Sequence, residues 1–293
     1  MYYTGKKEIL NALYRHMILT AQQLSVLLHY RVPSIYGMVM ELKGQGLVRR
    51  IPLPFLRKNH VGYTLTAYGA RAAATLAGEE EIFRAKAWEE DPVQLEHIFG
   101  TNAFFISLIQ HSLDIAGEGL VEWLDTRETA ERYVLIKDSG QKFTPLRPDG
   151  FGTYILPHRG KLVFHLEYDT GTETLWRLQD KLWNYGRILS GIWNDVESVH
   201  VLILTKVEGR SKSILKLWKS LCKGQLFGIN VPQVWSIHEK VWEQNGPDSA
   251  LWWGIGKDGK SLKEMNVLPF PADSNLPFLG KQIRERSPSV KNE

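Results

Sequence analysis

Cysteine is almost missing from this sequence, which has a single thiol, Cys222, among 293 residues. One thiol excludes an internal disulfide and a cysteine-based zinc cage. Long apolar runs are missing too, since none approaches the roughly 20 residues that span a bilayer. The N-terminal residues MYYTGKKEIL lack the apolar segment of a secretory signal. We therefore expect a cytoplasmic protein that makes no contact with a membrane.

The sequence also lacks a large charge excess, because 36 Lys and Arg residues face 32 Asp and Glu residues, for a net charge of +4. That excess is too small to indicate nucleic-acid binding, so the distribution of the basic residues decides the question. The hydrophobic content of 43% is ordinary for a globular protein. The length leaves room for two domains.

Residues 1–78 contain the pattern of a small helical domain with a hairpin. A first helix is followed by a Thr20-x-x-Gln23 capping box, which predicts the start of a second helix. Pro33 marks the start of a third helix, since proline is favoured in the first turn. A strand, a basic loop with prolines, a strand over 62–65 and a helix capped by Thr66 complete the segment. This order predicts a winged helix-turn-helix.

The segment resembles bacterial winged-helix DNA-binding domains. In that family the third helix enters the major groove and the wing contacts the adjacent backbone. The matching positions are Ser34, Tyr36, Gly37, Met40 and Lys43 on the third helix, and Arg49, Arg50, Arg57, Lys58 and His60 on the wing. The basic wing suits phosphate contacts, so we predict double-stranded DNA as the partner. The alternative is a protein-interaction module, which winged helices also form.

A charged connector over 79–92 precedes a second predicted domain over 93–245. A helix over 93–116 begins this domain and carries Glu96 and His97 among apolar neighbours. These two residues either join an acidic site or cap and cross-link helices. The remaining order of strand, hairpin, helix, strand, helix and strand predicts an α/β mixed sheet with flanking helices. Residues 246–293 are expected to form an irregular tail.

The most informative stretch is a predicted hairpin, in which strands 151–156 and 161–168 flank a Pro-His-Arg-Gly turn. Because side chains alternate along a strand, Glu167 and Asp169 share one face. The hairpin brings Asp149 to the same end. Three neighbouring carboxylates suit Mg²⁺ or Mn²⁺. The alternative is a common turn followed by solvated acids on an edge strand.

The following helix presents a core stripe that includes Tyr185, with Lys181 at its edge beside Arg177. An acidic hairpin end with a nearby cation is what metal-dependent phosphodiester cleavage needs. The hypothesis assigns metal binding to Asp149, Glu167 and Asp169, and it assigns Lys181 to orienting water or to stabilising the developing charge.

This layout also resembles the PD-(D/E)XK nucleases, which have a restriction-endonuclease-like fold, although Asp169 stands where that superfamily has lysine. Either Lys181 replaces that lysine, or the site is a degenerate copy that only binds. Taken whole, residues 5–240 are similar to the replication-relaxation family of plasmid and mobile-element proteins. The matching residues are Pro148, Asp149, Gly150, Glu167, Asp169, Gly171, Thr172, Glu173, Lys181 and Tyr185.

The family resemblance implies a DNA-binding role in plasmid replication or relaxation, as a metal-dependent endonuclease or nickase or as a non-catalytic copy-control factor. Glu96, His97, Glu173, Arg177 and Tyr185 are accessory candidates. A tyrosine nucleophile at Tyr185 is disfavoured, because no H-x-H metal motif accompanies it. A homodimer is expected from the symmetry common among DNA-reading proteins.

Overall fold

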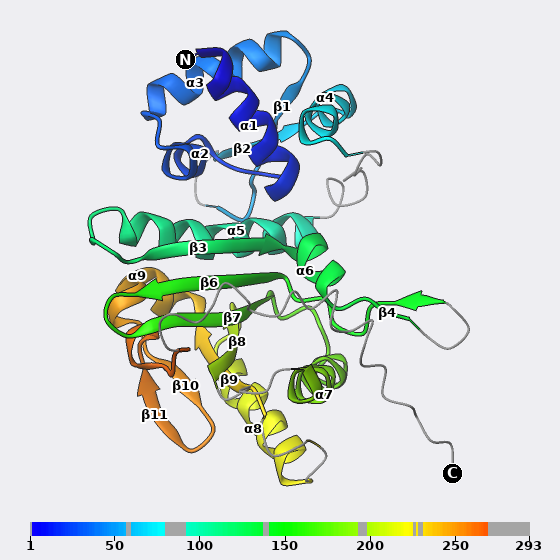
Figure 1. Ribbon diagram of the computed structural model, residues 1–293, viewed down its shortest axis with the longest axis vertical. Helices are drawn as coiled ribbons and strands as arrows, with labels where there is room; N and C mark the ends of the chain where they lie inside the picture. The colour runs from blue at the N-terminus through cyan, green and yellow to red at the C-terminus, as the bar shows by residue number, and fades with distance from the viewer. Residues whose placement is uncertain are drawn as a thin grey trace. The chain divides into compact units, whose positions relative to one another are not determined.

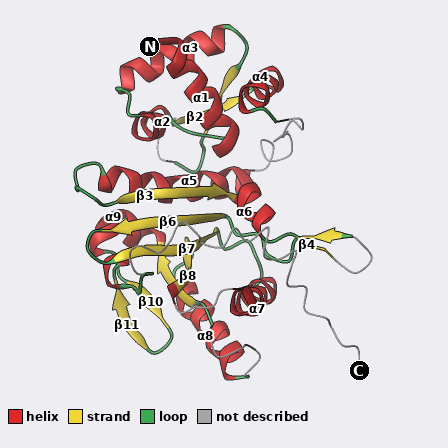
Figure 2. Cartoon of the chain, viewed as in Figure 1, coloured by secondary structure: helices red, strands yellow, loops and turns green. Residues whose placement is uncertain are grey.

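The computed structural model describes residues 2–56, 60–79, 92–136, 141–192, 198–224, 227 and 231–268. Its contacts divide the chain into two compact units, Met1–Gln110 and His111–Glu293. Figure 1 labels the elements of both units, and Figure 2 colours them by type. The two units are described in turn.

The described residues of the first unit contain four helices of a winged helix-turn-helix and one further helix. They are α1 (Tyr2–His16), α2 (Ala21–Leu28), α3 (Val32–Gly44), α4 (Ala67–Ala77) and α5 (Pro92–Ser112), the last of which continues into the second unit. The predicted capping box is confirmed: the Gln23 N–H donates to Thr20 Oγ1 at 3.1 Å, and the Thr20 N–H donates to Gln23 Oε1 at 2.9 Å. Pro33 lies in the first turn of α3.

The wing is an antiparallel pair of β1 (Val48–Pro52) and β2 (Val61–Leu65). After it, Thr66 Oγ1 accepts the Gly69 N–H at 3.0 Å and begins α4. Gly69 is required there, because a Cβ would lie 1.9 Å from the Leu47 carbonyl oxygen. Apolar side chains of α1, α2, α3 and β2 form one buried core. The predicted winged-helix order is therefore the observed one.

Asn102 ties α5 to the rest of the first unit. Its side-chain amide donates to the carbonyl oxygens of His16 at 2.8 Å and Ile18 at 3.0 Å, in a buried position. Leu95 also packs with Ile18 and the buried end of the wing. Residues 92–110 therefore belong to the first unit, whereas the sequence placed residues from 93 onward in the second domain.

The second unit is built on a mixed sheet, which among the described residues has seven strands in the order β11-β10-β9-β8-β7-β6-β3. The strands are β3 (Gly119–Asp125), β6 (Gly150–Leu156), β7 (Gly160–Asp169), β8 (Val199–Thr205), β9 (Gln233–His238), β10 (Trp252–Gly254) and β11 (Lys257–Lys260). β7, β8 and β9 are parallel, and the outer pairs are antiparallel. The expected α/β (α+β) class with a mixed sheet is confirmed.

Helices and a small hairpin accompany this sheet. They are α6 (Thr126–Arg132), β4 (Leu135–Ile136), β5 (Lys142–Phe143), α7 (Leu175–Ile192), α8 (Arg210–Lys223), α9 (Glu239–Ser249) and a 3-10 turn over Leu262–Glu264. Leu182 of α7 and Ile214 of α8 share a buried cluster with Val163, Val201 and Ile203. Since those strand residues lie on one face of the sheet, α7 and α8 cover the same face.

The C-terminal segment differs from the expectation of an irregular tail from residue 246. Residues 246–268 complete α9 and add β10 and β11 to the sheet. The Trp242 and Trp252 rings, with centroids 5.7 Å apart and both side chains buried, hold this segment to the unit. Predicted features over 80–91 and 269–293 lie outside the described residues. In the part of the chain that is described, no helix has the length and apolar character needed to cross a membrane.

Candidate functional site

The acidic site is positioned by the β6–β7 hairpin, which forms as predicted. Phe151 pairs with His165 and Leu156 with Gly160, in antiparallel register. The turn needs glycine at 160, where φ is +134° and a Cβ would lie 1.9 Å from the Leu268 carbonyl oxygen. The same register, together with the bond from the Asp149 N–H to the Leu166 carbonyl at 3.1 Å, places Asp149 beside Glu167.

Asp149 and Glu167 form a buried acidic pair, with 7% and 3% of their surfaces exposed. The Tyr168 N–H donates to Asp149 Oδ2 at 2.8 Å and orients that carboxylate. Burial raises the pKa of Glu167 well above its ordinary value, and the nearby charge of Asp149 raises it further. The pair thus places two mutually repelling carboxyl groups in a buried position on the hairpin.

Helix α7 supplies two partners of Glu167. Lys181 Nζ forms an ion pair with Glu167 Oε2, and the Tyr185 hydroxyl donates to Oε1. Burial acts to lower the pKa of Lys181, but the charges of Glu167 and Asp149 outweigh it and the pKa is raised. Burial and the charge of Glu167 also raise the pKa of Tyr185 well above its ordinary value. Lys181 is therefore a cation, and Tyr185 is a neutral phenol.

Asp169 has a different set of partners from the other two acids. Its Oδ2 accepts from Thr205 Oγ1 at 2.9 Å and from Arg210 Nε, and its Oδ1 accepts from the Gly171 N–H at 3.1 Å. Among the described residues, Asp149, Glu167 and Asp169 do not form a group whose ligand oxygens all lie within 4.8 Å of one another. Asp149 and Glu167 are thus neighbours, whereas Asp169 is bound by Arg210, and metal binding by the three carboxylates stays a prediction.

Arg210 did not stand out in the sequence, since it lies 41 residues from Asp169. Its position just after β8 is the one feature of the sequence that could have pointed to this contact. The carboxyl ends of neighbouring parallel strands meet at one edge of a sheet, and Asp169 ends the neighbouring strand β7. Arg210 also donates to the backbone oxygen of Glu173 at 2.6 Å. It therefore holds the segment between β7 and α7 in place.

The remaining accessory candidates are less closely linked to this pair. The charge of Glu173 contributes to raising the pKa of Lys181. Arg177 is exposed on α7, and its N–H donates to Thr174 Oγ1 at 3.4 Å. Glu96 and His97 lie on α5 in the first unit, and their accessory role stays a prediction.

The candidate DNA surface lies on α3 and the wing. Ser34, Tyr36, Met40 and Lys43 are exposed on α3, where Gly37 is partly buried, and Arg49, Arg50 and His60 are exposed on the wing. Burial raises the pKa of Tyr63 on β2, and the nearby Tyr36 and Arg50 also act on it, in opposite directions. Arg57 and Lys58 lie outside the described residues.

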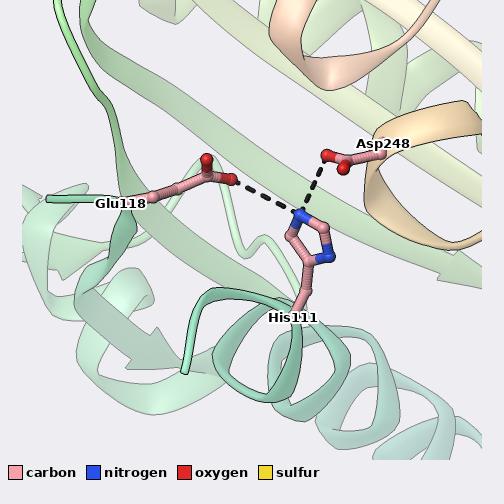
Figure 3. A group of neighbouring side chains, drawn as sticks. All are labelled: His111, Glu118 and Asp248. Carbon is pink, nitrogen blue, oxygen red and sulfur yellow. Dashed lines mark ion pairs between the residues drawn. The ribbon is translucent and has the colours of Figure 1, made fainter. Parts of the chain in front are cut away.

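A second charged cluster joins the end of α5 to α9. His111 Nε2 lies 2.8 Å from Asp248 and 3.5 Å from Glu118. Figure 3 shows both carboxylates pointing toward the His111 ring. The ligand atoms of these three residues lie within 4.8 Å of one another. However, Lys263 Nζ lies 2.6 Å from Asp248 and 3.6 Å from Glu118, and Tyr154 donates to Glu118 at 2.6 Å. Lys263 already offsets part of the negative charge of these acids, so we interpret the cluster as a structural ion-pair network.

The family model described as replication-relaxation matches residues 10–203. No curated protein and no solved structure matches. The matched range contains the winged helix and the hairpin, and it includes Asp149, Glu167, Lys181 and Tyr185, whereas Arg210 follows it.

Proposed function

The chain belongs to the replication-relaxation family, and on that premise we propose that it is a DNA-binding protein whose second unit nicks DNA with the help of Mg²⁺ or Mn²⁺. The family supports a role in plasmid replication or relaxation. The observation that carries the enzymatic part is the buried pair of Asp149 and Glu167 with Lys181 at its side.

The two carboxylates fit a hard divalent cation. They offer oxygen ligands, and the pKa of Glu167 is raised first by burial and then by the charge of Asp149, a repulsion that a bound cation would relieve. When bound, such an ion activates water and stabilises charge on the phosphate. Asp169 is left out of this ligand set, because its oxygens already accept from Arg210, Thr205 and Gly171.

Each neighbour of the pair has a role that follows from its protonation state. Tyr168 orients Asp149 through its backbone N–H, and Tyr185 orients Glu167 through its hydroxyl. Lys181 stays protonated because its pKa is raised, so it stabilises negative charge and does not take up a proton. The raised pKa of Tyr185 disfavours a phenolate nucleophile, in agreement with attack by water.

DNA binding is assigned to the first unit. We propose that α3 reads the major groove of duplex DNA through Ser34, Tyr36 and Lys43. Arg49 and Arg50 then contact phosphates beside it. The exposure of these side chains supports this assignment.

The second candidate is a non-catalytic DNA-binding factor for replication or copy control. One observation favours it: both oxygens of Glu167 already have partners in Tyr185 and Lys181. In this alternative the acidic pair and α7 stabilise the sheet, and the second unit serves assembly.

The test is incubation of the purified chain with supercoiled plasmid and Mg²⁺ or Mn²⁺. We expect nicked product from the parent protein and none from Asp149→Asn or Glu167→Gln. Asp180→Asn is the matched control, since it removes an exposed carboxylate from α7 beside Lys181. If the parent yields no nicked, linear or relaxed product with either metal, the enzymatic proposal is wrong and the second candidate stands.

A further inference from the structure

A groove of about 750 Å³ lies at the carboxyl ends of β8 and β9, and its lining does not include Asp149 or Glu167. Its lining comes from the start of α8, the start of α9 and the β10 region. In parallel sheets, ligands bind at the carboxyl edge of the strands. This location makes the groove a candidate binding site in its own right.

The lining combines positive charge with an exposed aromatic ring. Lys206, Lys212 and Lys240 line the groove, whereas Glu208 is the one carboxylate among the described residues that line it. Lys206 lies 4.0 Å from Glu239, so the exposed Lys212 and Lys240 supply most of the positive charge available to a ligand. Trp253 also lines the groove and is 50% exposed.

We propose that this groove binds single-stranded DNA, with a base stacked on Trp253 and phosphates paired with Lys212 and Lys240. Stacking on an aromatic side chain requires an unpaired base, whose faces a duplex hides. A lysine-lined groove beside such a ring provides the combination of charge and stacking that single-strand binding proteins use. This inference rests on the proposed DNA function, but it does not require cleavage.

The groove is linked to the acidic hairpin by one loop. The Lys206 N–H donates to the Asp169 carbonyl at 3.0 Å, and Arg210 pairs with the Asp169 carboxylate. Lys206 and Gly209 of the same loop line the groove. Single-stranded DNA held in the groove would therefore lie next to the end of β7, the β-strand that carries Glu167.

The test is fluorescence anisotropy of a labelled oligothymidylate of about 15 nucleotides with the full chain in EDTA, so that no metal-dependent cleavage occurs. Every protein in this test also carries Arg49→Ala and Arg50→Ala, so that binding of the oligonucleotide by the wing is reduced. We expect Trp253→Ala to weaken binding roughly tenfold and Trp253→Phe to retain most of it, since phenylalanine still stacks. Lys212→Ala with Lys240→Ala should lower the slope of log affinity against log salt by about 0.7 per lost phosphate contact.

Matched controls are Trp176→Ala, which removes another exposed tryptophan, and Lys216→Ala with Lys223→Ala on the exposed side of α8. Absence of binding by the parent, equal loss in the controls, or equal affinity for thymidine monophosphate would overturn the proposal. The parent protein could bind the oligonucleotide through Trp253 and yet nick no plasmid. That result would support DNA binding in the groove and would reject only the proposed nuclease activity. Photocrosslinking of iododeoxyuridine to Trp253, located by mass spectrometry, adds a direct readout that should be lost in Trp253→Ala.

Discussion

Lys181 on α7 forms an ion pair with Glu167 on β7, across a boundary between helix and sheet. Glu167 is almost fully buried, whereas the Lys181 side chain is 28% exposed. The helix thus supplies a positive charge to a carboxylate that has lost most of its water. The pair has consequences for both stability and chemistry, and the two can be separated by substitution.

Lys181→Met is expected to destabilise the second unit by about 1–3 kcal/mol, because it leaves a buried carboxylate without its cation. Denaturation with urea at pH 7 measures this change. Lys212→Met removes an exposed lysine that forms no ion pair with another described residue, so its effect should stay within about 0.5 kcal/mol. In the double variant Lys181→Met/Glu167→Gln, the loss should be smaller than the sum of the single losses.

Equal stability of Lys181→Met and the parent protein would contradict this interpretation of the ion pair. Strict additivity in the double variant would also contradict it, because residues that contact each other are expected to couple.

Asp169→Asn should lower stability by about 1–3 kcal/mol, since Arg210 and Thr205 lose a charged acceptor. It should leave the affinity for Mn²⁺ unchanged, whereas Asp149→Asn should abolish binding. Isothermal titration with Mn²⁺ measures both affinities. Equal loss of Mn²⁺ binding in the two variants would instead restore the three-carboxylate ligand set expected from the sequence.

The hairpin could be predicted from the sequence because it depends on local signals. The turn at 157–160 and the alternation along β7 fix the register, and the register alone places Asp149 beside Glu167. The Thr20 capping box and the start of α3 at Pro33 are equally local. Local elements that depend on such short-range rules therefore follow the prediction.

The partner of Asp169 could not be predicted in the same way. Arg210 reaches Asp169 only because β8 packs parallel to β7, and that pairing is a long-range event. The strands β10 and β11 were missed for a related reason. They are short and rich in glycine, and the burial of Trp252 against Trp242 decides their structure.

Acid should destabilise the second unit through His165, whose pKa burial lowers to about 3, with a further lowering by the charge of Arg132. In the unfolded chain the pKa returns to about 6.5. Between these values the unfolded chain binds a proton that the folded chain does not, so this stability is complete above pH 6.5 and falls as the pH falls towards 3. The slope approaches about 1.4 kcal/mol per pH unit.

Urea denaturation at pH 7 and pH 5 tests this, with His165→Gln as the variant. The substitution also removes the hydrogen bond to the Tyr133 hydroxyl, so stability at pH 7 should fall. The difference between the two pH values should nevertheless shrink relative to the parent. His158→Asn, at an exposed turn position, should keep the difference of the parent; an unchanged difference in His165→Gln would show that other groups cause the acid sensitivity.

The combined variant Arg49→Ala/Arg50→Ala should bind duplex DNA more weakly, because each arginine is exposed on β1, beside the α3 helix that we propose enters the major groove. If both contact phosphates, the slope of log affinity against log salt should become shallower by about 1 for each residue. The loss should be similar for different DNA sequences, since phosphate contacts carry little sequence information. Anisotropy titrations over a range of salt concentrations measure the slope.

Arg71→Ala is the control, because it removes an exposed arginine from α4 and should leave the slope unchanged. If the slope also stays the same in Arg49→Ala/Arg50→Ala, the wing is not part of the DNA-binding surface.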